Sequence, residues 1–310
     1  MEEISNVIKL YNIELINYKL LSRGYASRKW IIIDKNKKKY LLKEIKNQSI
    51  NRLNKVLHVQ SKLEDFSPKI IETKNKKLYA SYKQNCYYLS EFIESERLDI
   101  FSHMHDIGLF LATLHKKMFA IKDVHTSFLK VENNLNILNE YLEYHKLHNH
   151  ADYVEIIEYK LSILGKLRIT DINFNNLTKQ IIHGDFYGDN LLYANFSYKI
   201  VDFDQCCEFY KEYEILRGMF MLCSDSLLSK KVLYQMKEFI DGYCTLEKIN
   251  SPKDAYNLYL YIQANSLSSI KPDDYGKKEK MSFAKKRFKI LKSLVENKAN
   301  IIKILEGDYK

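Results

Sequence analysis

The stretch HGDFYGDN, from His183 to Asn190, places a histidine, two acids and an amide in one short polar loop behind a pair of isoleucines. The segment that follows, LLYANFSYKIVDFD, predicts a strand, a turn and a second strand that ends at Asp202 and Asp204. A hairpin of this kind returns Asp202 to the neighbourhood of Asn190. The sequence therefore predicts one site that is built from both segments.

These residue types at this spacing suit phosphoryl transfer. Charge that develops on the transferred phosphoryl group and on the leaving diphosphate is met by metal ions, because no side chain can neutralise it alone. Mg²⁺ prefers hard oxygen ligands, which the carboxylate of Asp202 and the amide of Asn190 supply. Asp185 can face the same space and orient an attacking hydroxyl. We prefer this interpretation to the alternative that each polar residue only caps a turn.

The elements around the loop are of two kinds. Residues 13–46 predict three short strands, IELINYKLLS, SRKWIIID and KYLLKEI, because β-branched and aromatic residues alternate with turn residues. Apolar residues then recur at helical spacing from about Ile50 to Glu64, before Pro68. KIIET, KLYASYK and CYYLSEFI return to strand character. The N-terminal third is expected to hold about five strands, with one helix inserted after the third.

The pattern changes after Glu94. HDIGLFLATLHKKM, NNLNILNEYLEYHKL and YVEIIEYKLSILGKL each repeat apolar residues with a helical period, and the chain from Glu212 onward is again helical between two loops. We expect an α+β protein in which residues 1–94 form an antiparallel sheet with one helix and residues 95–310 are mainly helical.

The pair HGDFYGDN and IVDFD resembles the aminoglycoside phosphotransferase and choline kinase superfamily, the small-molecule branch of the protein-kinase fold. The resemblance implies a bilobal fold, with residues 1–94 as the nucleotide-binding lobe and residues 95–310 as the catalytic and acceptor-binding lobe. It also implies roles for the loop residues: Asp185 as the catalytic base, His183 as a brace of the loop, Asn190 and Asp202 as metal ligands, and Asp204 as an auxiliary ligand.

The resemblance further implies a nucleotide site for ATP or GTP with Mg²⁺. Lys43 in YLLKEI is similar to the third-strand lysine that grips the α- and β-phosphates, against the alternative of a strand lysine with its amine in solvent. The other implied positions are a phosphate-covering loop and a hinge whose backbone pairs with adenine, namely Ser22, Gly24 and Ser27 in SRGYAS, and Glu91, Phe92 and Ile93 in SEFI.

One departure concerns the inserted helix. Kinases of this fold pair the third-strand lysine with a helix glutamate, yet residues 45–63 contain no acid, and Glu44 and Glu64 lie at their edges. Either Gln60 or an acid from elsewhere holds Lys43, or the nucleotide site is weakened. SPKIIETKNKKLYASYKQNCYYLSEFIE is most similar to the spore-coat-associated and homoserine-kinase-like branches. A kinase-like protein of low or no activity, with a binding or structural role, is therefore the alternative function.

Acids that follow the metal loop are candidates for an acceptor pocket, because this family's acceptor site forms there. They are Glu208, Glu212, Asp225 and Asp273. Their clustering favours a cationic acceptor such as an amine or aminosugar, and an exposed acidic helix start is an equal alternative. We expect an ATP- and Mg²⁺-dependent phosphotransferase that acts on a hydroxyl of a small metabolite, with amine-bearing and aminoglycoside-like molecules as candidates.

The composition of the chain argues against some classes of binding partner. There are 49 lysines and arginines against 39 acids, a net charge of +10, but the lysines are scattered in turns rather than gathered on one element, so nucleic-acid binding is not expected. No apolar run reaches membrane-spanning length, so we expect a cytoplasmic protein, monomeric or homodimeric, with the spore coat as the alternative location.

The cysteines and one group of histidines could suggest a metal site or redox chemistry, but neither is expected. The five cysteines are odd in number and lack CxxC spacing, so reduced thiols are expected rather than zinc or disulfides. His145, His148 and His150 lack a carboxylate partner and predict a solvated helix end.

Overall fold

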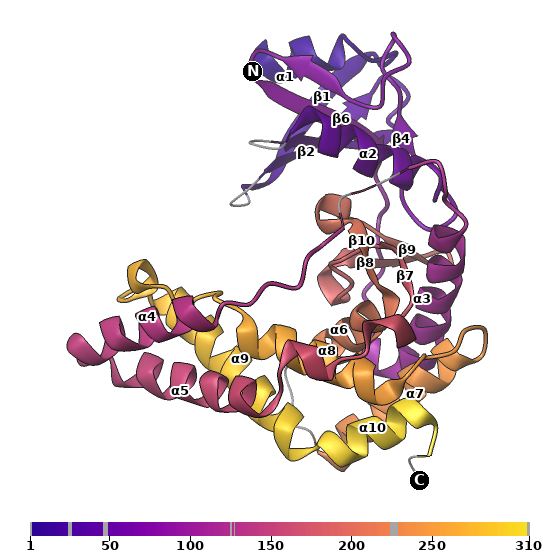
Figure 1. The fold of residues 1–310 in the computed structure, drawn as a ribbon. Helices are drawn as coiled ribbons and strands as arrows, with labels where there is room; N and C mark the ends of the chain where they lie inside the picture. Colours follow the sequence, from indigo (N-terminus) through magenta and orange to yellow (C-terminus); the bar gives the residue numbers. More distant parts are fainter. Residues whose placement is uncertain are drawn as a thin grey trace. The chain divides into compact units, whose positions relative to one another are not determined.

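The computed structural model describes residues 2–23, 27–45, 49–124, 126, 128–223 and 229–308. The chain divides into two compact units (Figure 1). Unit 1 comprises Met1–Asp99, Leu114–Ser127 and Ile181–Glu208, and unit 2 comprises Ile100–Thr113, Phe128–Gln180 and Phe209–Lys310. The chain thus crosses between units several times, and a functional boundary between residues 94 and 95 stays a prediction.

An antiparallel sheet of six strands forms the centre of unit 1. The strands are β1 Leu15–Arg23, β2 Arg28–Asp34, β3 Lys39–Ile45, β4 Ile70–Ile71, β5 Ala80–Tyr82 and β6 Asn85–Glu91. Their order is β1-β2-β3-β6-β4, with β5 paired to β6. Each predicted strand is confirmed, although the sheet has six strands rather than about five. The β2–β3 register sets Lys29 directly opposite Lys43.

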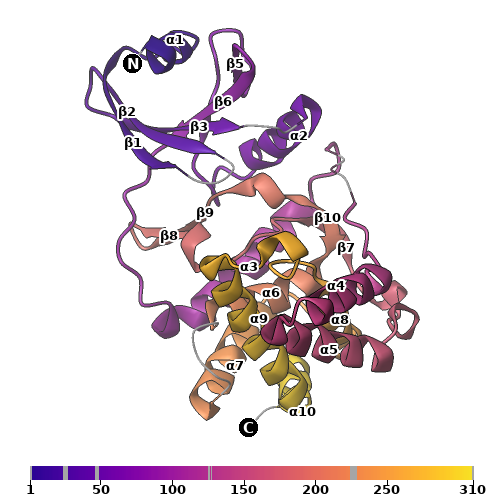
Figure 2. The ribbon, with the colours of Figure 1, turned by 90° about the vertical axis from the view of Figure 1, so that its left-hand side faces the viewer.

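Two apolar clusters hold the sheet to its helices. Helix α1 (Glu2–Ile8), which the sequence did not predict, packs Ile4, Val7 and Ile8 with buried sheet residues that include Trp30 and Leu42. Helix α2 (Ile50–Ser61) is confirmed, and it packs Leu53 and Leu57 with Ile70 and Tyr88. Figure 2 shows α2 beside the strands that it covers. The burial of apolar side chains fixes the position of α2 relative to β3 and β6.

The polar loop and the hairpin form as predicted. Strand β7 (Lys179–Ile182) leads into the loop, and β8 (Leu191–Ala194) pairs antiparallel with β9 (Ser197–Ile200). The turn residues Asn195 and Phe196 both have positive φ, 51° and 58°, as a two-residue hairpin turn of type I′ requires. Strand β10 (Cys207–Tyr210) then pairs with β7.

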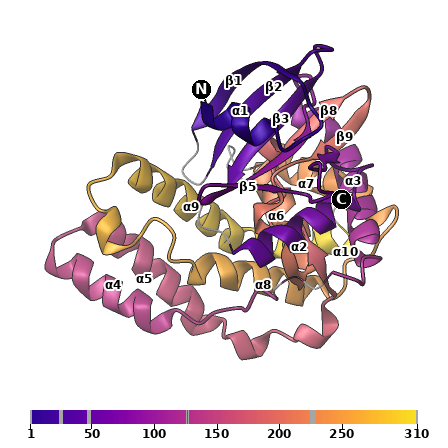
Figure 3. The ribbon, with the colours of Figure 1, turned by 90° about the horizontal axis from the view of Figure 1, so that it is seen from above.

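Unit 2 is helical, as predicted. Its helices are α4 Leu135–Leu147, α5 Ala151–Lys166, α6 Lys211–Leu222, α7 Lys230–Cys244, α8 Pro252–Asn265, α9 Lys278–Glu296 and α10 Lys298–Glu306, and α3 (Met104–Phe119) begins in this unit. Helices α4 and α5 lie side by side (Figure 3). Helix α8 packs against α5, α6, α9 and α10, and every residue along it from Ala255 to Tyr261 is buried. Helix α8 is therefore the central helix of unit 2.

Short 3₁₀ turns connect these elements: η1 Ile100–His103, η2 Ile169–Asp171, η3 Phe174–Asn176, η4 Gly188–Asn190, η5 Phe203–Gln205 and η6 Pro272–Asp274. Within the described ranges, no helix combines the length and apolar character that crossing a bilayer requires.

The prediction of a solvated histidine cluster is wrong in part. His148 is exposed, but His145 is fully buried and His150 nearly so. The His145 ring stacks on Tyr153, and its Nδ1 lies 2.8 Å from Nδ1 of His150. Tertiary packing of α4 against α5 buries these rings, which helical periodicity alone does not reveal.

Helices α3 and α7 cross where each carries a glycine. A Cβ on Gly108 would lie 2.0 Å from the Phe239 carbonyl oxygen, and one on Gly242 would lie 1.9 Å from that of His105. The two backbones are therefore too close for any side chain at the crossing. In contrast, a Cβ on Gly165 in α5 would meet nothing within 4 Å.

We predict that Gly108→Ala lowers the free energy of unfolding by at least about 1–3 kcal/mol, because the added methyl group forces α3 and α7 apart. Gly165→Ala is the matched control, and it should stabilise the protein by up to about 1 kcal/mol because alanine favours the helix. Thermal unfolding midpoints measure both changes. Equal midpoints for the two variants would contradict the close crossing.

Candidate active site

The polar loop is held by His183 and Gly184. The buried His183 ring lies with Nε2 3.1 Å from the Val201 carbonyl oxygen, and its Nδ1 accepts the Asp185 N–H at 3.3 Å. Gly184 has φ 80°, and a Cβ there would lie 2.3 Å from the Gln205 carbonyl oxygen. The imidazole therefore joins the loop to the segment that follows β9, and only glycine fits beside it.

Asp185 and Asn190 are bonded to each other. Asn190 Nδ2 donates to the Asp185 carbonyl oxygen at 2.9 Å and to its Oδ2 at 3.1 Å. The Asn190 carbonyl in turn accepts the Val201 N–H at 2.9 Å, which attaches the loop to the hairpin. Because Nδ2 faces Asp185, the amide oxygen Oδ1 is the atom of Asn190 that is turned from it. The loop thus presents one carboxylate and one amide oxygen in fixed positions.

Asp202 meets two lysines of the sheet. Its Oδ1 accepts from Lys43 Nζ at 2.7 Å, and its Oδ2 accepts from Lys29 Nζ at 3.0 Å. Burial alone would raise the pKa of the Asp202 carboxyl, but the two ammonium groups outweigh burial and hold that pKa below its usual value. Asp202 also has a left-handed backbone, φ 68° and ψ 64°, which costs a non-glycine residue about 1–3 kcal/mol. The site therefore holds an ionised carboxylate on a strained backbone.

Two acids bind Lys43 in the absence of a glutamate on the inserted helix. Lys43 is only 1% exposed, and its Nζ lies 2.8 Å from Asp204 Oδ2 in addition to Asp202. Burial would lower the pKa of Lys43, but the nearby Tyr88 and the two acids raise it above its usual value. The interpretation that Gln60 holds Lys43 is wrong, because Gln60 Nε2 donates to the Pro68 carbonyl oxygen at 3.3 Å. An acid from elsewhere, Asp204, takes that place.

Helix α2 reaches the same segment through a cation. The Arg52 guanidinium donates to the Asp204 carbonyl oxygen at 2.9 Å. Lys29 was missed by sequence reasoning, although its position could have been found by counting back from the β2–β3 turn to the residue opposite Lys43.

The structure describes only some of the other residues that were predicted to bind the nucleotide. Ser22 pairs with Lys29 through the β1–β2 ladder, but its side chain and Gly24 lie outside the described residues, and Ser27 is half-buried. At the expected hinge, the N–H of Glu91 donates to Lys69 O and the N–H of Phe92 to Lys39 O. Ile93 follows them, half-buried.

The predicted acceptor acids differ in exposure. Glu208 is half-buried in β10 and Asp273 is exposed in η6, whereas Asp225 lies outside the described residues. Glu212 is fully buried, with Oε2 accepting the Thr178 N–H at 3.0 Å and Oε1 without a hydrogen-bond partner. Burial raises the pKa of this carboxyl. Such a group lies within the core of unit 2 and is poorly placed to meet an acceptor.

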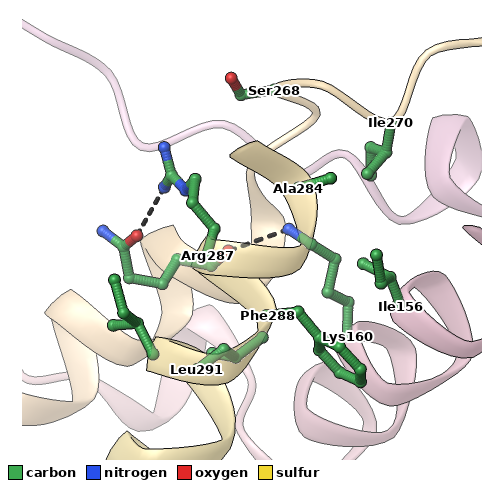
Figure 4. A pocket seen from close by; sticks show the side chains of 10 residues that line it. Ile156, Lys160, Ser268, Ile270, Ala284, Arg287, Phe288 and Leu291 are labelled. Atoms are coloured by element: carbon green, nitrogen blue, oxygen red, sulfur yellow. Dashed lines mark hydrogen bonds between the residues drawn. The ribbon is translucent and has the colours of Figure 1, made fainter. Parts of the chain in front are cut away.

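Unit 2 also contains two neighbouring cations, the buried Lys160 and the half-buried Arg287 (Figure 4). Lys160 Nζ donates to three carbonyl oxygens at the end of α8, those of Gln263 at 3.0 Å, Ala264 at 3.3 Å and Ser266 at 2.7 Å. Burial and the neighbouring Arg287 lower the pKa of Lys160 to about 7, while the three acceptors favour its protonated form. All three donors of the ammonium group are used to cap α8, so Lys160 has a structural role.

The donor atoms suit magnesium. Asp202 and Asp204 supply carboxylates and Asn190 supplies an amide oxygen, a set of hard ligands that leaves room for water and phosphate oxygens. In the part of the chain that is described, no group of three or more His, Cys, Asp or Glu side chains could hold a metal ion. The predicted magnesium ligands do not form such a group, because the third of them is the amide of Asn190.

Comparison with known proteins places this geometry in a fold. No model of a protein family and no curated protein matches the sequence. An amicoumacin kinase in complex with AMP-PNP and Ca²⁺ matches with a TM-score of 0.67 at 12% identity, covering 93% of this chain and 92% of that one. A spectinomycin phosphotransferase in complex with ADP matches at 0.64 and 14%, covering 96% and 98%. A choline kinase from Cryptosporidium parvum matches at 0.64 and 14%, covering 98% of both chains.

These likenesses confirm the α+β protein-kinase-like fold that the loop pair predicted, as it occurs in aminoglycoside phosphotransferases and choline kinases. The nearer resemblance to the spore-coat branch stays a prediction.

The burial of Glu212 predicts a pH dependence of stability. Because the folded-state pKa is raised, the unfolded chain loses this proton first as the pH rises through about 4.3. The carboxyl therefore lowers the free energy of unfolding increasingly until the pH passes its folded pKa. Glu212→Gln removes this effect, so the unfolding midpoint of the variant minus that of the wild type should rise as the pH increases above about 4.3, the pKa of the unfolded chain, and should level off once the pH passes the raised folded-state pKa. A difference that stays constant or falls with pH would rule out a buried, proton-retaining Glu212.

Proposed function

We propose that the protein is a phosphotransferase that moves the terminal phosphoryl group of Mg²⁺-ATP to a hydroxyl of a small acceptor. The observation that carries the proposal is the bonding of Asp202 to the buried Lys43, one hairpin away from the bonded pair Asp185 and Asn190. A structural role alone would not explain an ionised carboxylate on a strained backbone beside a buried cation. The fold of solved small-molecule kinases supports the same conclusion.

Each residue then has a task that its contacts suit. Asp202 and Asn190 would hold Mg²⁺, which supplies neutralisation of the charge on the phosphates. Asp204 would remain bound to Lys43 and could add only its second carboxylate oxygen as an auxiliary ligand. Lys43 would bind phosphate oxygens. Asp185 would accept a hydrogen bond from the acceptor hydroxyl and take its proton, a contribution of about 10²–10⁴ in rate. His183 keeps Asp185 in place through the loop backbone.

The acceptor class follows from charge. Glu208 and Asp273 keep some or all of their exposure, so they remain candidates for binding an amine, with Asp225 still a prediction. Glu212 is left out because its carboxyl is buried and bonded to Thr178. An amine-bearing or aminoglycoside-like alcohol is therefore the proposed acceptor, and ATP or GTP the donor.

We predict that Mg²⁺-ADP raises the thermal unfolding midpoint of the wild type, because a ligand at 100 times its dissociation constant adds about 2.7 kcal/mol of stability. Asp202→Ala should lose the Mg²⁺-dependent part of this shift. Asp185→Asn should keep the shift but lose about 10²–10⁴ of the rate of ADP release with an amine-bearing alcohol and Mg²⁺-ATP.

Asp189→Asn, an exposed acid of the same loop, is the matched control and should keep both the shift and the rate. Wild-type protein that shows no shift with millimolar Mg²⁺-ADP would overturn the proposal and favour a kinase-like binding or structural role. Asp202→Ala turning over at the wild-type rate would also refute it.

A further inference from the structure

The β2–β3 register places a second lysine beside Lys43. Lys29 and Lys43 are directly opposite partners in an antiparallel pair, so their side chains leave the same face of the sheet. Like charges in opposed positions destabilise a sheet unless other charges compensate. Here the compensating charge comes from Asp202, whose two oxygens each bind one of the two ammonium groups.

The two lysines differ in how they are held. Lys43 is almost fully buried, with 2% of its side chain exposed, and it has a second carboxylate partner in Asp204. The Lys29 side chain is 27% exposed, and within the described residues Asp202 is the carboxylate that it meets. If Asp202 turns to another partner, Lys43 therefore keeps an anchor whereas Lys29 does not.

We propose that Lys29 is a second phosphate-binding lysine, which exchanges Asp202 for the phosphates of a nucleoside diphosphate or triphosphate. This inference rests on the proposed function, in which Asp202 becomes a metal ligand. A carboxylate that binds Mg²⁺ no longer neutralises two ammonium groups, so both become available to the anionic ligand that arrives with the metal. Asp204 keeps Lys43 oriented during the exchange, while Lys29 follows the phosphates from the open side of the cluster.

The proposed exchange would account for the excess of cations around this segment. Lys29, Lys43 and Arg52 bring three cations to a segment that offers two carboxylates, Asp202 and Asp204. Added phosphates and added Mg²⁺ fit this excess, because each new charge finds a group of opposite sign already in place. A nucleoside lacks the phosphates and gains nothing from Lys29.

Isothermal titration of the full chain with Mg²⁺-ADP and with adenosine tests the inference. We expect Lys29→Met to weaken Mg²⁺-ADP binding by about ten- to a hundredfold, the size of one lost charge-assisted hydrogen bond, and to leave adenosine binding unchanged. Lys29→Arg should keep most of the Mg²⁺-ADP affinity, because it keeps the charge.

Lys35→Met is the matched control. Lys35 lies just past β2 in the same hairpin and also pairs with one acid, Glu14 at 2.6 Å, but on an exposed surface. This variant loses the same charge and should bind Mg²⁺-ADP as the wild type does. Unfolding midpoints of the unliganded variants show whether each one is folded.

The outcomes separate this inference from the proposed function. Wild-type binding of Mg²⁺-ADP with unchanged or tighter binding by Lys29→Met would overturn the role of Lys29 and leave the function standing, because Lys29 would then only restrain Asp202. An equal loss of affinity for Mg²⁺-ADP and adenosine would also overturn it, since that pattern indicates damage to the sheet. If the wild type binds no Mg²⁺-ADP, the function and the inference fail together.

Discussion

The candidate site depends on the burial of one ammonium group. Lys43 can remain charged in the interior of unit 1 only because Asp202 and Asp204 lie within 2.8 Å of its Nζ. Removing one partner of a buried ion pair typically costs about 3–5 kcal/mol, more than most single contacts contribute. These ion pairs therefore fix the position of the segment after β9 relative to β3. The loop that contacts this segment through His183 is positioned relative to β3 in turn.

The same segment is held from its other side by the backbone of the loop. His183 meets the Val201 carbonyl oxygen, and Gly184 leaves room for the Gln205 carbonyl. These contacts over-determine the left-handed conformation of Asp202, so its strain persists in the folded state. His183 and Gly184 thus meet the two ends of one short turn, at Val201 and Gln205, and Lys43 binds the two acids between those ends. Together these contacts fix the position of the Asp202 carboxylate.

What the sequence revealed was mostly local. Strands, helices and the hairpin from Leu191 to Ile200 follow from the spacing of neighbouring residues, and so does the pairing of the loop with the hairpin. The partner of Lys43 was not predictable in this way, because Asp202 is 159 positions away and no local rule selects it over Gln60. The burial of His145 and Glu212 also escaped prediction, because it depends on how whole elements pack together and not on the local spacing of apolar residues.

The loss of an acid from α2 changes how that helix is linked to the site. In the usual arrangement a helix glutamate binds the lysine, so the helix position controls the lysine directly. Here Asp204 binds Lys43, and α2 is connected one step further out, through Arg52 and the Asp204 carbonyl oxygen. A movement of α2 would therefore act first on the backbone that carries Asp204, and would reach Lys43 and Asp202 together. The position of Lys43 and the position of the proposed metal ligand Asp202 are therefore coupled, because both depend on the short segment that carries Asp202 and Asp204. A glutamate on the helix would hold the lysine independently of that segment.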